Sequence, residues 1–112
     1  METNRQQKIN RLIQKELSEI FLLETKKMHG VLVSVTNVRV SPDLSMAHAY
    51  LSIFPSEKAA EILGNIKDSV RTLRFELGRR LGKQLRIIPE LMIHLDDSLD
   101  YIENIDKLLK DD

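Results

Sequence analysis

The chain has 112 residues, 42% hydrophobic and 30% charged, a length and composition typical of one globular domain and not of a disordered segment. It has no cysteine, which excludes a disulfide framework and thiolate metal sites, and no apolar run approaches the ~20 residues that a membrane span needs. Its formal net charge is zero, but residues 67–89 hold seven Lys/Arg against two Asp/Glu, whereas residues 90–112 hold two against eight.

The first predicted element is an amphipathic helix. Lys8, Arg11 and Lys15 cluster on one face, which we expect to meet solvent. Gly30 suits the loop after the helix, because glycine adopts backbone conformations that other residues avoid. The apolar residues recur at helical spacing on the opposite face and are Ile9, Leu12, Ile13, Leu17, Ile20 and Phe21.

Two strands are predicted next. Residues 31–40 are rich in β-branched side chains, and their apolar parity changes between Val35 and Val38, which indicates a bulge near Asn37. Residues 41–45 have the composition of a turn, and its shortness predicts an antiparallel hairpin. In the second strand one face carries Ala47, Ala49, Leu51 and Ile53, and the other carries Met46, His48, Tyr50 and Ser52.

A long helical pattern follows the hairpin. It opens at Pro55 and Ser56, and Ser56 is the predicted N-cap. The pattern runs for over twenty residues, so we expect a break between Gly64 and Gly78. Its apolar residues are Ile62, Leu63, Ile66, Val70, Leu73, Leu77, Leu81 and Leu85.

The last predicted elements are a strand and a short helix. Residues 91–95 alternate in the way of a strand, and Pro89 belongs at its start because proline has no N–H to donate. Asp97 or Ser98 is expected to cap the final helix. The order αββααβ plus a C-terminal helix predicts an α+β fold. No repeat, linker or secretory signal is evident, so we expect a single cytoplasmic domain spanning residues 1–112.

The sequence contains no recognisable set of catalytic residues. His29, His48 and His94 do not have the spacing of metal ligands, and no serine lies in a nucleophile motif. No glycine-rich phosphate loop occurs. The acidic residues after Leu95 match no calcium-loop spacing and are better explained as a solvated helix face. We therefore expect a protein without catalytic residues, metal or cofactor.

The basic segment is the strongest functional signal. Its charge favours a polyanionic partner. On a helical wheel Arg79 and Lys83 point away from the apolar stripe, and Phe75 lies outside the stripe near Arg71. An exposed aromatic ring beside guanidinium groups can stack on an unpaired base. The alternative is that Phe75 packs under the C-terminal helix.

Several short segments occur in a characteristic order. They are LIQKEL at 12–17, VRVSPDL at 38–44, AYLS at 49–52, LRFELGRRL at 73–81 and PEL at 89–91, followed by Asp97-Ser98 and Tyr101-Ile102. Each is weak alone, but all of them in order are specific. The chain resembles the bacterial ribosome-binding factor A family over almost its whole length.

The resemblance implies a type II KH-like fold, which agrees with the αββααβ order. It also implies an assembly factor, not an enzyme, that binds the 30S small ribosomal subunit, assists 16S rRNA maturation including the 5′ end, and supports growth in the cold. The family replaces the KH G-x-x-G loop with a helix–kink–helix that carries Ala-x-Gly. That motif falls at Ser69, Val70 and Arg71, so this chain departs from it and gains a charge at Arg71.

Our hypothesis is a monomer that binds the small subunit through rRNA, without a membrane or cofactor. The acidic end would face away from rRNA or touch a basic ribosomal protein. The rival interpretations are a general single-stranded RNA-binding KH module and a protein–protein adaptor that uses the sheet face of Met46, His48 and Tyr50. The candidate RNA-binding residues are Arg5, Lys8, Arg11, Lys15, Lys67, Arg71, Arg74, Phe75, Arg79, Arg80, Lys83 and Arg86.

Overall fold

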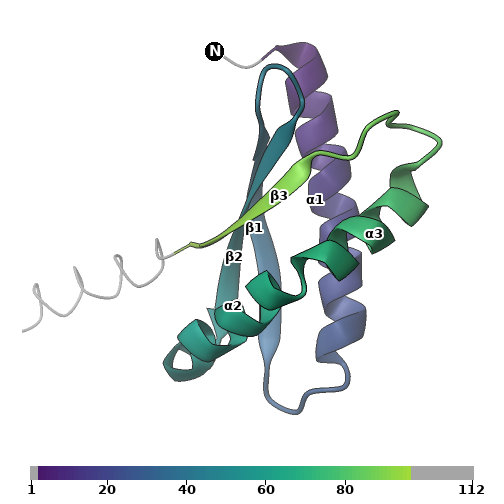
Figure 1. Cartoon of the computed structure of the whole chain (residues 1–112). Coiled ribbons are helices and arrows are strands. Elements are labelled where there is room, and N and C mark those ends of the chain that lie inside the picture. The colour runs from purple at the N-terminus through teal and green to yellow at the C-terminus, as the bar shows by residue number, and fades with distance from the viewer. Residues whose placement is uncertain (1–2, 97–112) are drawn as a thin grey trace, which may run out of the picture.

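The computed structural model describes residues 3–96 and shows a three-stranded sheet with helices packed against it (Figure 1). The α+β order predicted from the sequence is confirmed. The predicted C-terminal helix lies outside the described residues. The elements are α1 (Asn4–Thr25), β1 (Leu32–Val40), β2 (Met46–Phe54), the 3-10 helix η1 (Ser56–Lys58), α2 (Ala59–Asp68), α3 (Val70–Leu81) and β3 (Glu90–Leu95).

Helix α1 is fixed at its start and along its buried face. Thr3 and Gln6 form a capping box, in which each side chain accepts a hydrogen bond from the backbone N–H of the other. Two buried polar side chains then bind the end of β1. The Gln6 amide donates to the Val40 carbonyl, and the Asn10 carbonyl oxygen accepts from the Val40 N–H at 2.8 Å. These bonds set the position of α1 along the sheet.

The sheet has the order β1-β2-β3, so β2 is the central strand. Strands β1 and β2 are antiparallel, and their register shifts between Val35 and Asn37, which confirms the predicted bulge. Strand β3 runs parallel to β2, with Ala49 opposite Ile93. The side chains that point to the helices from all three strands are small or branched and apolar. No described helix covers the other face of the sheet (Figure 1).

The hairpin turn is held by Asp43. Its carboxylate accepts hydrogen bonds from the hydroxyls of Ser41 and Ser45 and from the Ser45 N–H. These bonds stabilise the charged form and lower the pKa of Asp43 to about 2. Leu44 takes a positive φ of 63°, and Gly30, in the loop after α1, takes 77°. The loop conformation predicted for Gly30 is therefore confirmed.

The long helical pattern divides at Ser69, inside the predicted interval. The Ser69 N–H donates to the Asn65 and Ile66 carbonyls, and its own carbonyl accepts from Leu73 N–H at 3.0 Å, so α3 begins at once. The φ of Ser69 is −101°, which any residue can adopt. Among the residues that the structure describes, Leu44 is the only non-glycine residue with a positive φ, so this break does not require glycine at position 71.

The prediction of Ser56 as a helix cap is wrong. Residues Ser56–Lys58 form a 3-10 turn before α2. Pro55 occupies the N-cap position of this turn, and no side chain makes a capping hydrogen bond there. The Pro55 carbonyl accepts from the Lys58 N–H at 3.1 Å, so the turn is closed by the backbone. The propensity of serine for caps was outweighed by this turn, because its hydrogen bond starts at Pro55 and places Ser56 inside the turn instead of just before a helix.

One core joins α1, α3 and the inner face of the sheet. Ile13, Leu17, Leu51, Leu77 and Leu81 are fully buried within it. Because Leu73, Leu77 and Leu81 hold one side of α3 in the core, the opposite side of the helix faces outward. The exposed arginines of α3 are Arg71, Arg74 and Arg79.

Candidate nucleic-acid interface

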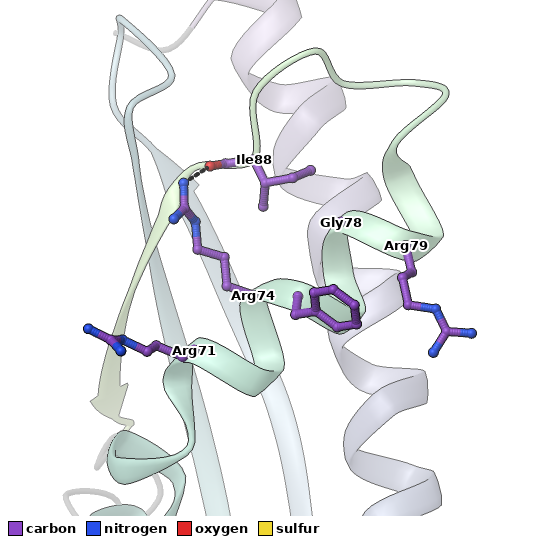
Figure 2. Close-up of a pocket in the computed structure, with 6 residues that line it drawn as sticks. Arg71, Arg74, Gly78, Arg79 and Ile88 are labelled. Carbon is purple, nitrogen blue, oxygen red and sulfur yellow. Dashed lines mark hydrogen bonds between the residues drawn. The ribbon is translucent and has the colours of Figure 1, made fainter.

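A hollow of about 600 Å³ opens on the outer side of α3. All of its lining residues except Ile88 belong to α3, and Figure 2 shows that Ile88, from the segment before β3, closes one side. The lining consists of Arg71, Arg74, Phe75, Gly78, Arg79 and Ile88, so it holds three cations and no acidic residue. Gly78 and Ile88 were not among the predicted site residues. Only weak sequence features indicate these two residues. Gly78 lies at helical spacing from Arg71, and Ile88 comes directly before Pro89.

Arg74 is oriented by the backbone of the next segment. Its Nη2 donates to the Ile88 carbonyl at 2.7 Å, drawn in Figure 2, and its Nε donates to the Pro89 carbonyl at 3.3 Å. The side chain remains exposed. A guanidinium that is fixed in this way loses less rotamer entropy when it meets a ligand.

Arg71 and Arg79 are more available. Arg71 is exposed and makes no hydrogen bond or ion pair within residues 3–96. Arg79 pairs with Glu76 one turn earlier at 3.1 Å, but its side chain is 67% exposed. An exposed pair of this kind contributes only ~0.2–1 kcal/mol, so an anion can displace it. Both arginines are therefore suited to phosphate contact.

Arg80, one residue further on, has a different environment. Its Nη1 donates to Glu16 at 3.1 Å and to Glu19 at 2.9 Å, both on α1, and the side chain is only 27% exposed. The hydrogen bond that Arg80 donates to the Glu16 carboxylate raises the pKa of Arg80 above its ordinary value. Of the predicted phosphate contacts, Arg80 is thus already neutralised by two carboxylates and joins α3 to α1.

Replacing Arg80 with alanine is expected to lower the free energy of unfolding by about 1 kcal/mol, because a half-buried charge pair with two partners is lost. Arg79→Ala is the matched control and should change it by less than about 0.5 kcal/mol. Urea unfolding followed by circular dichroism measures both. Equal stability of the two variants would show that the contacts of Arg80 with α1 contribute nothing.

A second basic surface lies at the start of α1. Arg5 and Lys8 line a hollow of about 350 Å³ together with Gln84 and Leu85, which follow α3. Lys83 and Arg86 are exposed in that same connecting segment, and Arg11 and Lys15 are exposed further along α1. Segment 82–89 thus borders both hollows. Lys67 is separate, since it lines a third hollow with His94 and Met92 beside β3.

The open sheet face carries a cluster of rings. Tyr50 stacks on His94 with centroids 5.0 Å apart, and His94 stacks on His48 at 5.1 Å. The His48 Nδ1 and His94 Nε2 atoms are 2.8 Å apart, so one donates and the other accepts. Burial, with repulsion from His48 and Lys67, lowers the pKa of His94. This face is the one that the adaptor interpretation would use.

The described part of the chain offers neither a metal site nor a membrane-spanning helix. Within residues 3–96 no three His, Asp or Glu side chains gather closely enough to hold a metal ion. No helix between the same limits combines the length and apolarity needed to cross a membrane.

Comparison with known proteins gives consistent matches. The model of the family described as ribosome-binding factor A matches residues 5–109. Ribosome-binding factor A of Flavobacterium psychrophilum is 48% identical, with 97% of this chain and 85% of the relative covered, and that of Cytophaga hutchinsonii is 50% identical, with 97% and 83% covered.

Two solved structures are similar in fold. The crystal structure of ribosome-binding factor A from Thermus thermophilus superimposes with a TM-score of 0.62 at 25% identity, covering 79% of this chain and 92% of that one. A model of the Thermus thermophilus protein fitted into a cryo-EM map of its complex with 30S gives a TM-score of 0.61 at 26% identity, covering 77% and 89%.

Proposed function

Because this chain belongs to the ribosome-binding factor A family, we propose that it binds the free 30S small ribosomal subunit and assists late maturation of 16S rRNA, including its 5′ end. It acts by binding, as an assembly factor and not as an enzyme. The observation that carries the proposal is the hollow on α3, where Arg71, Arg74 and Arg79 stand together with no carboxylate in the lining. The similarity to the Thermus thermophilus protein that was fitted into a 30S complex supports the choice of partner.

The contacts that we propose are chiefly with phosphates. Cations that neutralise phosphates release condensed counterions, and this supplies affinity without reading sequence. Arg71 and Arg79 would do this at the hollow on α3, and Arg5 and Lys8 at the start of α1. In a folded subunit the protein would recognise mainly the shape and backbone of rRNA, and so hold one local conformation until maturation proceeds.

We propose a cytoplasmic monomer whose acidic residues 97–112, which lie outside the described residues, face away from rRNA because like charges repel. The function requires neither a nucleotide nor a metal.

Sedimentation of cell lysate through a sucrose gradient tests the function. The protein should be enriched with free small subunits and absent from translating ribosomes. A signal only at the top of the gradient, at low salt as well, would contradict the proposal and favour a message-binding module or an adaptor. Treatment with RNase then distinguishes the message-binding module from the adaptor, because only complexes held together by RNA would dissociate.

A further inference from the structure

We propose that the hollow on α3 receives one unpaired nucleotide, with its base stacked on Phe75 and the neighbouring phosphates on Arg71 and Arg79. The inference rests on the proposed function, since it names the part of the RNA that this site would take. It goes beyond phosphate contact, because a stacked base is held by an apolar face and not by charge.

The exposure of the Phe75 ring is the first observation in favour of stacking. Its side chain is 67% exposed, although it is a large aromatic residue in a helix whose other large apolar side chains are buried. Within residues 3–96 nothing covers the ring, and it forms part of the wall of the hollow beside Ile88. An exposed ring costs solvation free energy that a ligand with an apolar face would recover.

The charges around the ring select a nucleotide over an apolar peptide. All three ionisable residues of the lining are arginines, so the hollow repels cationic groups and attracts phosphates. Arg71 and Arg79 lie on either side of Phe75 in the helix, four residues before it and four after it. A nucleotide has both features that this arrangement needs, because it joins a flat apolar base to charged phosphates.

The geometry also requires the base to be unpaired. In a duplex both faces of each base are covered by its neighbours, so a ring can stack only on a base that has left the helix. A volume of about 600 Å³ is within the range of small-ligand sites, ~300–1,000 Å³, and admits a base with its sugar. A Cβ atom on Gly78 would lie 3.4 Å from Ile88 Cγ1, so a larger side chain at this position would fill the hollow.

Arg74 would hold the edge of the site in place. Two backbone carbonyls, of Ile88 and Pro89, fix its guanidinium before any ligand arrives. The guanidinium N–H groups that make neither of these bonds can donate to polar atoms on the edge of the base. Arg74 is thus a positioning residue for the wall formed by Ile88 as well as a donor, because the same bonds tie segment 82–89 to α3.

The test compares three variants for binding to free 30S subunits from cells that lack the protein. Phe75→Ala should raise Kd by about tenfold or more, whereas Phe75→Trp, which keeps a stacking face, should bind like the parent. Ile87→Ala is the control, since Ile87 is 74% exposed and lies outside the lining of the hollow. The salt dependence of Kd should stay the same in Phe75→Ala, because no charge is lost. Thermal unfolding checks that each variant folds.

Chemical probing of the bound subunit supplies the second measurement. The parent protein should protect one unpaired base from base-modifying reagents, and Phe75→Ala should lose this protection while protection of the backbone from hydroxyl radicals remains. If Phe75→Ala binds and protects like the parent, the stacking inference is overturned, although the proposed function stands. If the parent protein itself does not bind the subunit, the proposed function fails first.

Discussion

Truncation of Leu77 to alanine is expected to destabilise the protein by about 3 kcal/mol, within the ~2–5 kcal/mol observed for buried leucines. Leu77 is 0% exposed and lies at the middle of α3, in the core that joins this helix to α1 and the sheet. Truncation removes apolar contacts and leaves a cavity that the surrounding side chains fill only in part. Urea unfolding at equilibrium measures the change.

Leu22→Ala is the matched control for this prediction. Leu22 is also in a helix, but it is 53% exposed, so its truncation should cost less than about 1 kcal/mol. Since small domains have only ~5–15 kcal/mol of stability, a loss of 3 kcal/mol is a large fraction of the total. A similar cost for the two variants would mean that α3 is not held by the core in the way the structure shows.

The predictions from residue periodicity were those that the structure confirms most directly. The bulge near Asn37 followed from a change of parity in β1, because a strand must turn its apolar side chains to one face. The division of the long helix followed from a pattern too long for one helix in a small domain, and it occurs at Ser69. Both predictions depend on which residues face the core, and the spacing of apolar residues in the sequence indicates this directly.

The charged contacts of the site could not be predicted in the same way. A helical wheel places Arg80 beside the apolar stripe, but it contains no information about Glu16 and Glu19, which are 64 and 61 positions away. The same holds for Arg74, whose orientation depends on the carbonyls of Ile88 and Pro89 after the chain has turned back. Exposure along one helix follows from the sequence, whereas pairing between distant segments depends on the tertiary fold.

The parallel pairing of β3 with β2 was also not predicted. Alternation in residues 91–95 indicated a strand, but it is equally compatible with either direction and either neighbour. The crossover through α2 and α3 is what allows β3 to lie parallel to β2, since parallel strands need a long connection. This topology brings Ile88 and Pro89 back beside α3, and so completes the hollow.

Reversal of charge at the hollow is expected to have the largest effect on binding. Arg71→Glu combined with Arg79→Glu should weaken binding to free small subunits by about a hundredfold at low salt. Each phosphate contact with a single strand contributes a slope of ~0.7 in log Kd against log salt, or about fivefold per contact at 0.1 M, and the carboxylates add repulsion. Kd measured between low and high salt should show a flatter dependence for the variant, because two counterion-releasing contacts are gone.

The control must change the net charge equally at another place. Lys27→Glu combined with Lys58→Glu does so, since both lysines are exposed and neither lines a hollow described above. This variant should lose a few-fold in affinity through the general field of the protein, and the loss should vanish at physiological salt, where the Debye length is ~8 Å. If both double variants lost affinity equally at every salt concentration, net charge alone would explain binding, and the hollow on α3 would not be the contact. A loss confined to Arg71 and Arg79 would place the phosphates beside Phe75, because the two arginines flank that ring on α3.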